Sequence, residues 1–91
     1  MDDTERVWLV ERTYSDDEQN IIILVYATPD GKRYLRKERA LTSFDGTGPE
    51  TLAALDVESE RLGVVDDPET ETRYAAEADR MAATHDPDDA V

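Results

Sequence analysis

Eight consecutive residues, Lys32 to Arg39, hold five of the ten basic side chains in a chain that carries 23 acidic ones. Cations in a row bind phosphates or carboxylates, and an aromatic ring among them can stack on a nucleobase. The side chains that could do this are Arg33, Tyr34, Arg36, Lys37 and Arg39. They predict either a surface for nucleic acid or an acidic partner, or the charged edge of a sheet, which repels other strands. We favour the edge, because phosphate binding weakens steeply with salt and the rest of the chain is acidic.

A second group near the end of the sequence offers one imidazole and three carboxylates: His85, Asp86, Asp88 and Asp89. Carboxylate oxygens suit Mg²⁺ or Ca²⁺. With one histidine and no predicted geometry, this is a weak metal candidate, and an acidic tail is favoured. The glycine-bearing residues 43–48 precede a predicted helix but lack the Lys-Ser/Thr ending of a phosphate loop.

The sequence has little for catalysis. It contains no cysteine and a single histidine, so thiol nucleophiles are excluded and a serine nucleophile would depend on His85. We expect a protein that is not an enzyme and that uses no cofactor.

The formal net charge is −13, and only two of the ten basic residues are lysine. Such a surface repels itself at moderate salt and is screened at molar salt, where the Debye length is about 3 Å. This composition resembles that of proteins from extremely halophilic archaea. The resemblance covers the whole chain, has no motif, and implies an environment without implying an activity. Mimicry of nucleic acid, or a role as acidic partner of a basic protein, are the other interpretations.

Three strands are predicted over about 6–14, 19–27 and 32–41, because these segments are rich in β-branched and aromatic residues. The second is apolar throughout, which is typical of a central strand. Residues Thr28 to Gly31 predict a type I turn followed by a glycine bulge. The pattern therefore predicts an antiparallel meander whose third strand lies at an edge.

The second half of the chain is predicted to be helical. Leu52, Leu55, Ser59 and Leu62 are spaced by three, four and three residues, which indicates one helix or two short ones over 49–62. Asp67 and Pro68 indicate an N-cap and a first helical residue, so a helix is predicted over 68–85. Residues 86–91 are expected to be a mobile tail. The chain is predicted to be a single α+β domain, 1–91.

If Thr28 pairs with Lys32, Tyr26 lies opposite Tyr34, and if Tyr14 pairs with Asn20, both sheet faces are apolar. The helices would cover one face, so the other predicts a homodimer or another protein partner. The longest apolar run, Ile21 to Ala27, is far shorter than the roughly 20 residues of a membrane helix. The acidic N-terminus is unlike a signal peptide. We expect a soluble cytoplasmic protein that acts through protein–protein contacts, with a nucleic-acid-binding accessory protein as the alternative.

Overall fold

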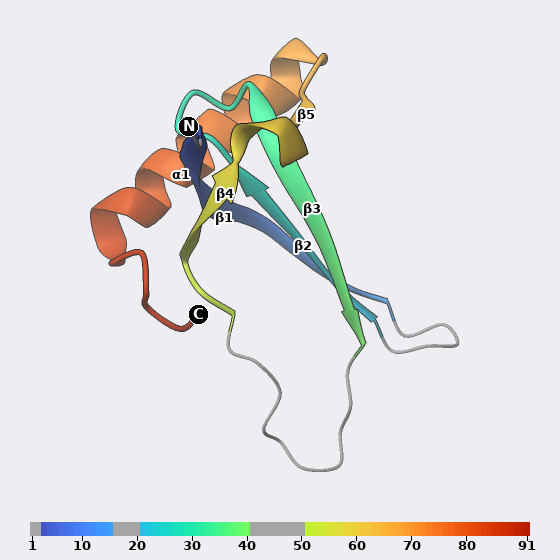
Figure 1. The fold of residues 1–91 in the computed structure, drawn as a ribbon, viewed down its shortest axis with the longest axis vertical. Coiled ribbons are helices and arrows are strands. Elements are labelled where there is room, and N and C mark those ends of the chain that lie inside the picture. The colour runs from blue at the N-terminus through green and yellow to red at the C-terminus, as the bar shows by residue number, and fades with distance from the viewer. Residues whose placement is uncertain (1–2, 16–20, 41–50) are drawn as a thin grey trace.

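A computed structural model describes residues 3–15, 21–40 and 51–91. The described chain forms a five-stranded antiparallel sheet and one C-terminal helix (Figure 1). The strand order is β4-β1-β2-β3-β5. The elements are β1 (Thr4–Ser15), β2 (Ile21–Ala27), β3 (Arg33–Ala40), β4 (Ala54–Glu58), the 3₁₀ turn η1 (Ser59–Arg61), β5 (Gly63–Val64) and α1 (Pro68–Thr84).

The α+β class is confirmed, and β2 is the central strand, as its apolar run predicts. The prediction of three strands is wrong, because β4 lies within the segment predicted as helical over 49–62 and a further strand, β5, follows directly after that segment. The alternation of Leu55, Asp56, Val57 and Glu58 is half-buried, exposed, buried and exposed, which is the period of a strand. Pairing along β1 buries Val57, and this tertiary gain outweighs the helical spacing of the leucines. Residues 49 and 50 lie outside the described part.

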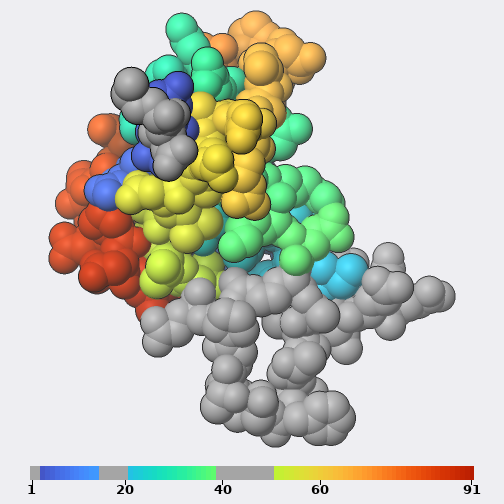
Figure 2. All heavy atoms as spheres, viewed as in Figure 1, coloured from blue at the N-terminus to red at the C-terminus, as the bar shows by residue number. Residues whose placement is uncertain are grey.

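The sheet is strongly curled. Its two edge strands, β4 and β5, are separated in the chain only by η1 and Leu62. In a flat sheet they would lie four strand spacings apart, about 19 Å. The five peptide steps from Glu58 to Gly63 span at most about 17 Å even when extended, and three of these residues form a 3₁₀ turn. The edges therefore bend towards each other, and Figure 2 shows β4, η1, β5 and β3 side by side on one face.

The concave side of the curl holds most of the core. The strand registers place Val7, Leu24, Tyr26, Leu35 and Val57 on one face of the sheet, and all five are buried. Burial of large apolar side chains such as these stabilises the fold by about 1.5–3 kcal/mol each before the entropy of ordering is subtracted.

The helix α1 packs against β1 and, less extensively, β2 on the opposite side of the sheet. Its Arg73 pairs with Glu11, and its buried residues Ala78 and Met81 join the core. The predicted start is observed: Asp67 is the N-cap and its side chain accepts the Thr70 N–H. The observed end, Thr84, is one residue before the predicted one.

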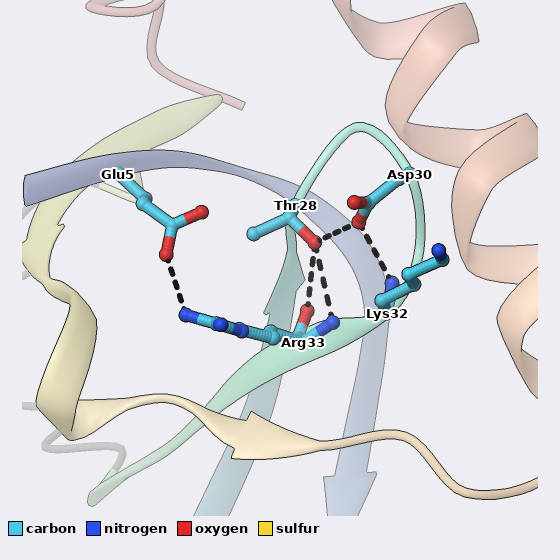
Figure 3. Close-up of polar contacts among 5 residues, drawn as sticks. All are labelled: Glu5, Thr28, Asp30, Lys32 and Arg33. Atoms are coloured by element: carbon cyan, nitrogen blue, oxygen red, sulfur yellow. Dashed lines mark hydrogen bonds and ion pairs between the residues drawn. The ribbon is translucent and has the colours of Figure 1, made fainter.

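The turn between β2 and β3 is built around the Thr28 side chain, which is 3% exposed. Its hydroxyl donates to Asp30 Oδ1 over 2.6 Å and accepts the Arg33 N–H over 3.2 Å (Figure 3). Asp30 Oδ1 also accepts the Lys32 N–H over 2.9 Å, and Gly31 has the predicted positive φ of 74°. These bonds hold four residues in the loop where three were predicted.

The longer loop shifts the register by one residue. Thr28 pairs with Arg33, not Lys32, and Tyr26 lies opposite Leu35, not Tyr34. The predicted register is therefore wrong here, because the Asp30 carboxylate holds Lys32 in the loop. Tyr14 likewise lies opposite Ile22, and not opposite Asn20 as predicted; a bulge between Leu9 and Glu11 accounts for one residue of this difference.

The expectation of one uncovered apolar face is not met in the described residues. Curling buries one face and α1 covers much of the other, so that the exposed large hydrophobic residues among those described are Tyr14 and Val64. The last residues are not a free tail either. Ala53 and Ala54 donate backbone hydrogen bonds to Asp89 and Pro87, and Val91 donates to Thr51. No helix in the described part of the chain is long and apolar enough to cross a membrane.

Candidate functional site

The basic strand is β3, and β5 covers only its first part. The Val65 N–H donates to the Lys32 carbonyl, and β5 pairs with Arg33 and Tyr34. Backbone groups alternate between the two sides of a strand. Arg33 bonds towards β2, so positions 34, 36, 38 and 40 direct their N–H and C=O groups to the outer side. Beyond Tyr34, no described strand pairs with this side, and we call residues 36–40 the β3 outer edge.

The prediction that β3 is an edge strand is therefore wrong for its first two residues and holds, within the described chain, for the β3 outer edge. The sequence could not have revealed β5, because a two-residue strand has no hydrophobic period. Its pairing with β3 depends on the curl that brings η1 across the sheet.

The cations of β3 are partly neutralised by the chain itself. Arg33 forms an ion pair with Glu5 over 2.9 Å (Figure 3), and Arg36 pairs with Glu38 on the same strand. Lys37 is exposed and has no ion pair with any described residue. Arg39 lies at a strand position opposite Ile22. Exposed pairs of this kind contribute about 0–1 kcal/mol to stability. They therefore reduce the positive charge of the surface, but a ligand can still displace them.

The predicted register placed Tyr26 opposite Tyr34, where both rings could stack on bases, but the structure separates them. Tyr26 and Tyr34 lie on opposite faces of the sheet, because Tyr26 shares its row with Leu35. Tyr26 is only 2% exposed, and its hydroxyl donates to the Leu52 carbonyl over 2.8 Å. A stacking surface made of both rings is thus not present.

Tyr34 instead lines a groove of about 190 Å³ between β5 and the start of α1. We call this the tyrosine groove. Tyr34 and Tyr74 both border it, although they are far apart in the sequence, and the helical spacing of Tyr74 indicates only core packing. Its lining residues are Tyr34, Val64, Val65, Asp66, Asp67, Thr70 and Tyr74.

A larger hollow of about 300 Å³ lies between β1 and the second half of α1. Several of its polar groups already have partners. Arg12 donates to the Val91 carbonyl, Arg80 pairs with Glu77, and Glu11 pairs with Arg73. It therefore offers few unpaired polar groups with which to orient a ligand.

His85 is the C-cap residue of α1, and its Nδ1 lies 2.8 Å from the Thr84 hydroxyl. Asp89 accepts the Asp86 N–H and so closes a turn, and Asp88 is exposed. The residues of the weak metal candidate thus serve local turns. In the described ranges, no three histidine or acidic side chains come close enough together to hold a metal ion. Residues 43–48 lie outside those ranges.

Over the residues that the structure describes, these features define a small α+β protein with a curled antiparallel sheet, one covering helix and a partly open third strand. The chain belongs to a family of unknown function (DUF7967), whose model matches residues 1–91. No curated protein and no solved structure matches it.

Proposed function

We propose that this protein is a non-enzymatic interaction domain that binds an acidic, extended segment of another protein along the β3 outer edge. The observation that carries the proposal is the length difference between β5 and β3. The strand β5 pairs with β3 at Arg33 and Tyr34, and β3 continues for six more residues, to Ala40. An incoming strand would continue the line of β5.

The edge offers two kinds of contact. The outward N–H and C=O groups at positions 36 and 38 provide main-chain hydrogen bonds, which supply the affinity in strand addition. Exposed Arg36 and Lys37 project from opposite faces of the strand, so each favours an acidic residue on its own face of the added segment. Attraction at this short range survives the negative charge elsewhere, because the Debye length is about 8 Å at physiological salt.

A second copy of this chain fits the edge poorly. Antiparallel pairing about a two-fold axis places the residue at the axis opposite its own copy. Every position from 36 to 39 is charged, so any such pairing centred there sets two like charges directly opposite each other. That arrangement is destabilising, and it favours a different protein as the partner.

Nucleic acid is the weaker alternative. Arg33 already forms an ion pair with Glu5, and Tyr26 is buried on the sheet face opposite that of Tyr34. A nucleic-acid strand also has no backbone N–H groups with which to extend a sheet.

The test uses a pair of substitutions at one position. Arg36→Pro removes the outward N–H and leaves the bonds to β2 intact, as an edge strand permits. Arg36→Ala removes the charge and keeps the N–H. The probe is a soluble peptide of alternating valine and glutamate, followed by backbone amide shifts and hydrogen exchange in NMR spectra.

We expect the Glu38 amide to become protected when the peptide binds. Arg36→Ala should weaken binding a few-fold, the loss of one exposed charge contact. Arg36→Pro should weaken it more than tenfold, because a main-chain hydrogen bond of about 1 kcal/mol and the strand geometry are lost together. Arg80→Ala, which removes another cation with an ion-pair partner on its own element, is the matched control and should have no effect. Equal effects of alanine and proline at position 36, or no binding, would refute strand addition.

A further inference from the structure

The tyrosine groove combines aromatic walls with an acidic rim. Tyr34 and Tyr74 line it together with the carboxylates of Asp66 and Asp67. Tyr34 packs tightly beside Gly63, where an added Cβ would lie 2.8 Å from the ring. Gly63 therefore lets the strand pass beside the Tyr34 ring, which forms one wall of the groove.

The carboxylates of Asp66 and Asp67 differ in whether they already have hydrogen-bond partners. Asp67 caps α1 and accepts hydrogen bonds from the Thr70 hydroxyl and, more weakly, the Thr70 N–H, which lower the pKa of its carboxyl. Asp66 is exposed and has no hydrogen bond or ion pair with any described residue. It is the carboxylate free to meet a ligand.

Aromatic faces attract cations through their quadrupole. A cation–π contact of this kind already exists at Tyr74, because the guanidinium of Arg73 lies over its ring, 5.4 Å from the ring centroid. Arg73 is not among the residues that line the groove, so the groove itself is open to another cation.

The start of a helix carries a partial positive charge of about half a unit, which opposes a cation. Here it is outweighed, since Asp66 precedes the helix, Asp67 caps it, and Glu69 and Glu71 lie in its first turn. The local charge is therefore negative.

We propose that the tyrosine groove binds the guanidinium group of an arginine side chain on a partner protein. Its volume of about 190 Å³ suits one side chain and lies below the roughly 300–1,000 Å³ of sites for drug-sized molecules. Arginine fits better than lysine because a planar guanidinium can stack on tyrosine while its N–H groups reach a carboxylate. This contact is independent of the β3 outer edge and uses different residues.

The experiment compares two short, otherwise uncharged peptides with one central residue changed. One carries arginine, and the other carries citrulline, which has nearly the same shape and no charge. Binding is followed by NMR shifts of the backbone amides of Val65, Asp66 and Thr70. We expect the arginine peptide to bind at least about tenfold more tightly than the citrulline peptide.

Variants separate charge, ring and fold. Asp66→Asn should weaken the binding of the arginine peptide. Asp79→Asn, which neutralises an exposed acid on α1, should leave that binding unchanged. Tyr74→Phe should keep binding and Tyr74→Leu should lose it, with circular dichroism showing that each variant is folded. Equal binding of both peptides, no binding of the arginine peptide, or equal effects of Asp66→Asn and Asp79→Asn would overturn the proposal. None of these results depends on the β3 outer edge.

Discussion

Replacing Gly31 by alanine should destabilise the protein strongly, because the turn that contains Gly31 packs directly against α1. Gly31 has a φ of 74° and approaches the backbone of the helix so closely that an added Cβ would lie 2.1 Å from the Glu71 carbonyl oxygen and 2.8 Å from the Ala75 nitrogen. Both neighbours are backbone atoms and cannot swing away. The turn or the helix would have to move.

The expected loss is about 2–4 kcal/mol. The left-handed conformation costs alanine about 1–2 kcal/mol, and forcing a methyl group into packed structure costs a further 1–3 kcal/mol. The smaller entropy of the unfolded alanine chain returns about 0.4–1 kcal/mol. A chain of this length has a total stability of about 5–14 kcal/mol, so the loss is a large fraction of it.

The assay is urea unfolding followed by circular dichroism, with the free energy compared at an unchanged m-value. Gly31→Asn is the first control, since asparagine accepts a positive φ but still carries a Cβ. If contact with α1 dominates, asparagine should be nearly as destabilising as alanine. Gly63→Ala is the second control, and it should lose less because its Cβ meets the Tyr34 side chain, which can shift. A change in the free energy of unfolding of Gly31→Ala within about 0.5 kcal/mol of zero, the range of ordinary surface changes, would refute the close packing of this turn against the helix.

Two further predictions concern charge. The pKa of Asp30 is lowered, chiefly by the hydrogen bond from the Thr28 hydroxyl and then by that from the Lys32 N–H. The Asp30 carboxylate therefore stabilises the folded protein fully above the ordinary aspartate pKa of about 4. This stabilisation is lost as the pH falls through the lower pKa of the folded state. In urea unfolding between about pH 5 and pH 2, the stability advantage of the wild type over Asp30→Asn should therefore shrink, and a constant difference would contradict the hydrogen bonds of this turn. With a net charge of −13, the melting temperature should rise between about 0.1 M and 1 M KCl as the Debye length falls from about 10 to 3 Å, and a flat or falling curve would remove the inference of salt adaptation.

The local signals in this sequence predict local structure well. Asp67 and Pro68 mark the start of α1, and Pro29, Asp30 and Gly31 mark the turn between β2 and β3. In both places a side chain satisfies a backbone group within a few residues, so the chemistry is contained in the motif. The central position of β2 follows from its apolar run in the same way.

Features that depend on distant residues were not predictable. Leu55 fits the helical spacing with Leu52 and Leu62 as well as the strand alternation with Val57, and only pairing with β1, about fifty residues earlier, decides between them. The one-residue shift that separates Tyr26 from Tyr34 is a local exception, because it depends on the bond from the Lys32 N–H to the Asp30 carboxylate, and the turn pattern did not predict that bond. For the candidate sites, the sequence indicated the cations of β3, but the ion pair of Arg33 with Glu5 and the meeting of Tyr34 with Tyr74 require the fold.

The short link between β4 and β5 also constrains the order of folding. A two-residue strand such as β5 is too short to remain paired by itself. Once β4 has paired with β1, however, η1 holds β5 within reach of Lys32 and Tyr34, and the entropy of closing that loop is small. We therefore expect the two opposite edges of the sheet to form in one kinetic step, after the hairpin of β2 and β3. The rate of that step should be set by the long-range pairing of β1 with β4, since contacts distant in sequence form slowly.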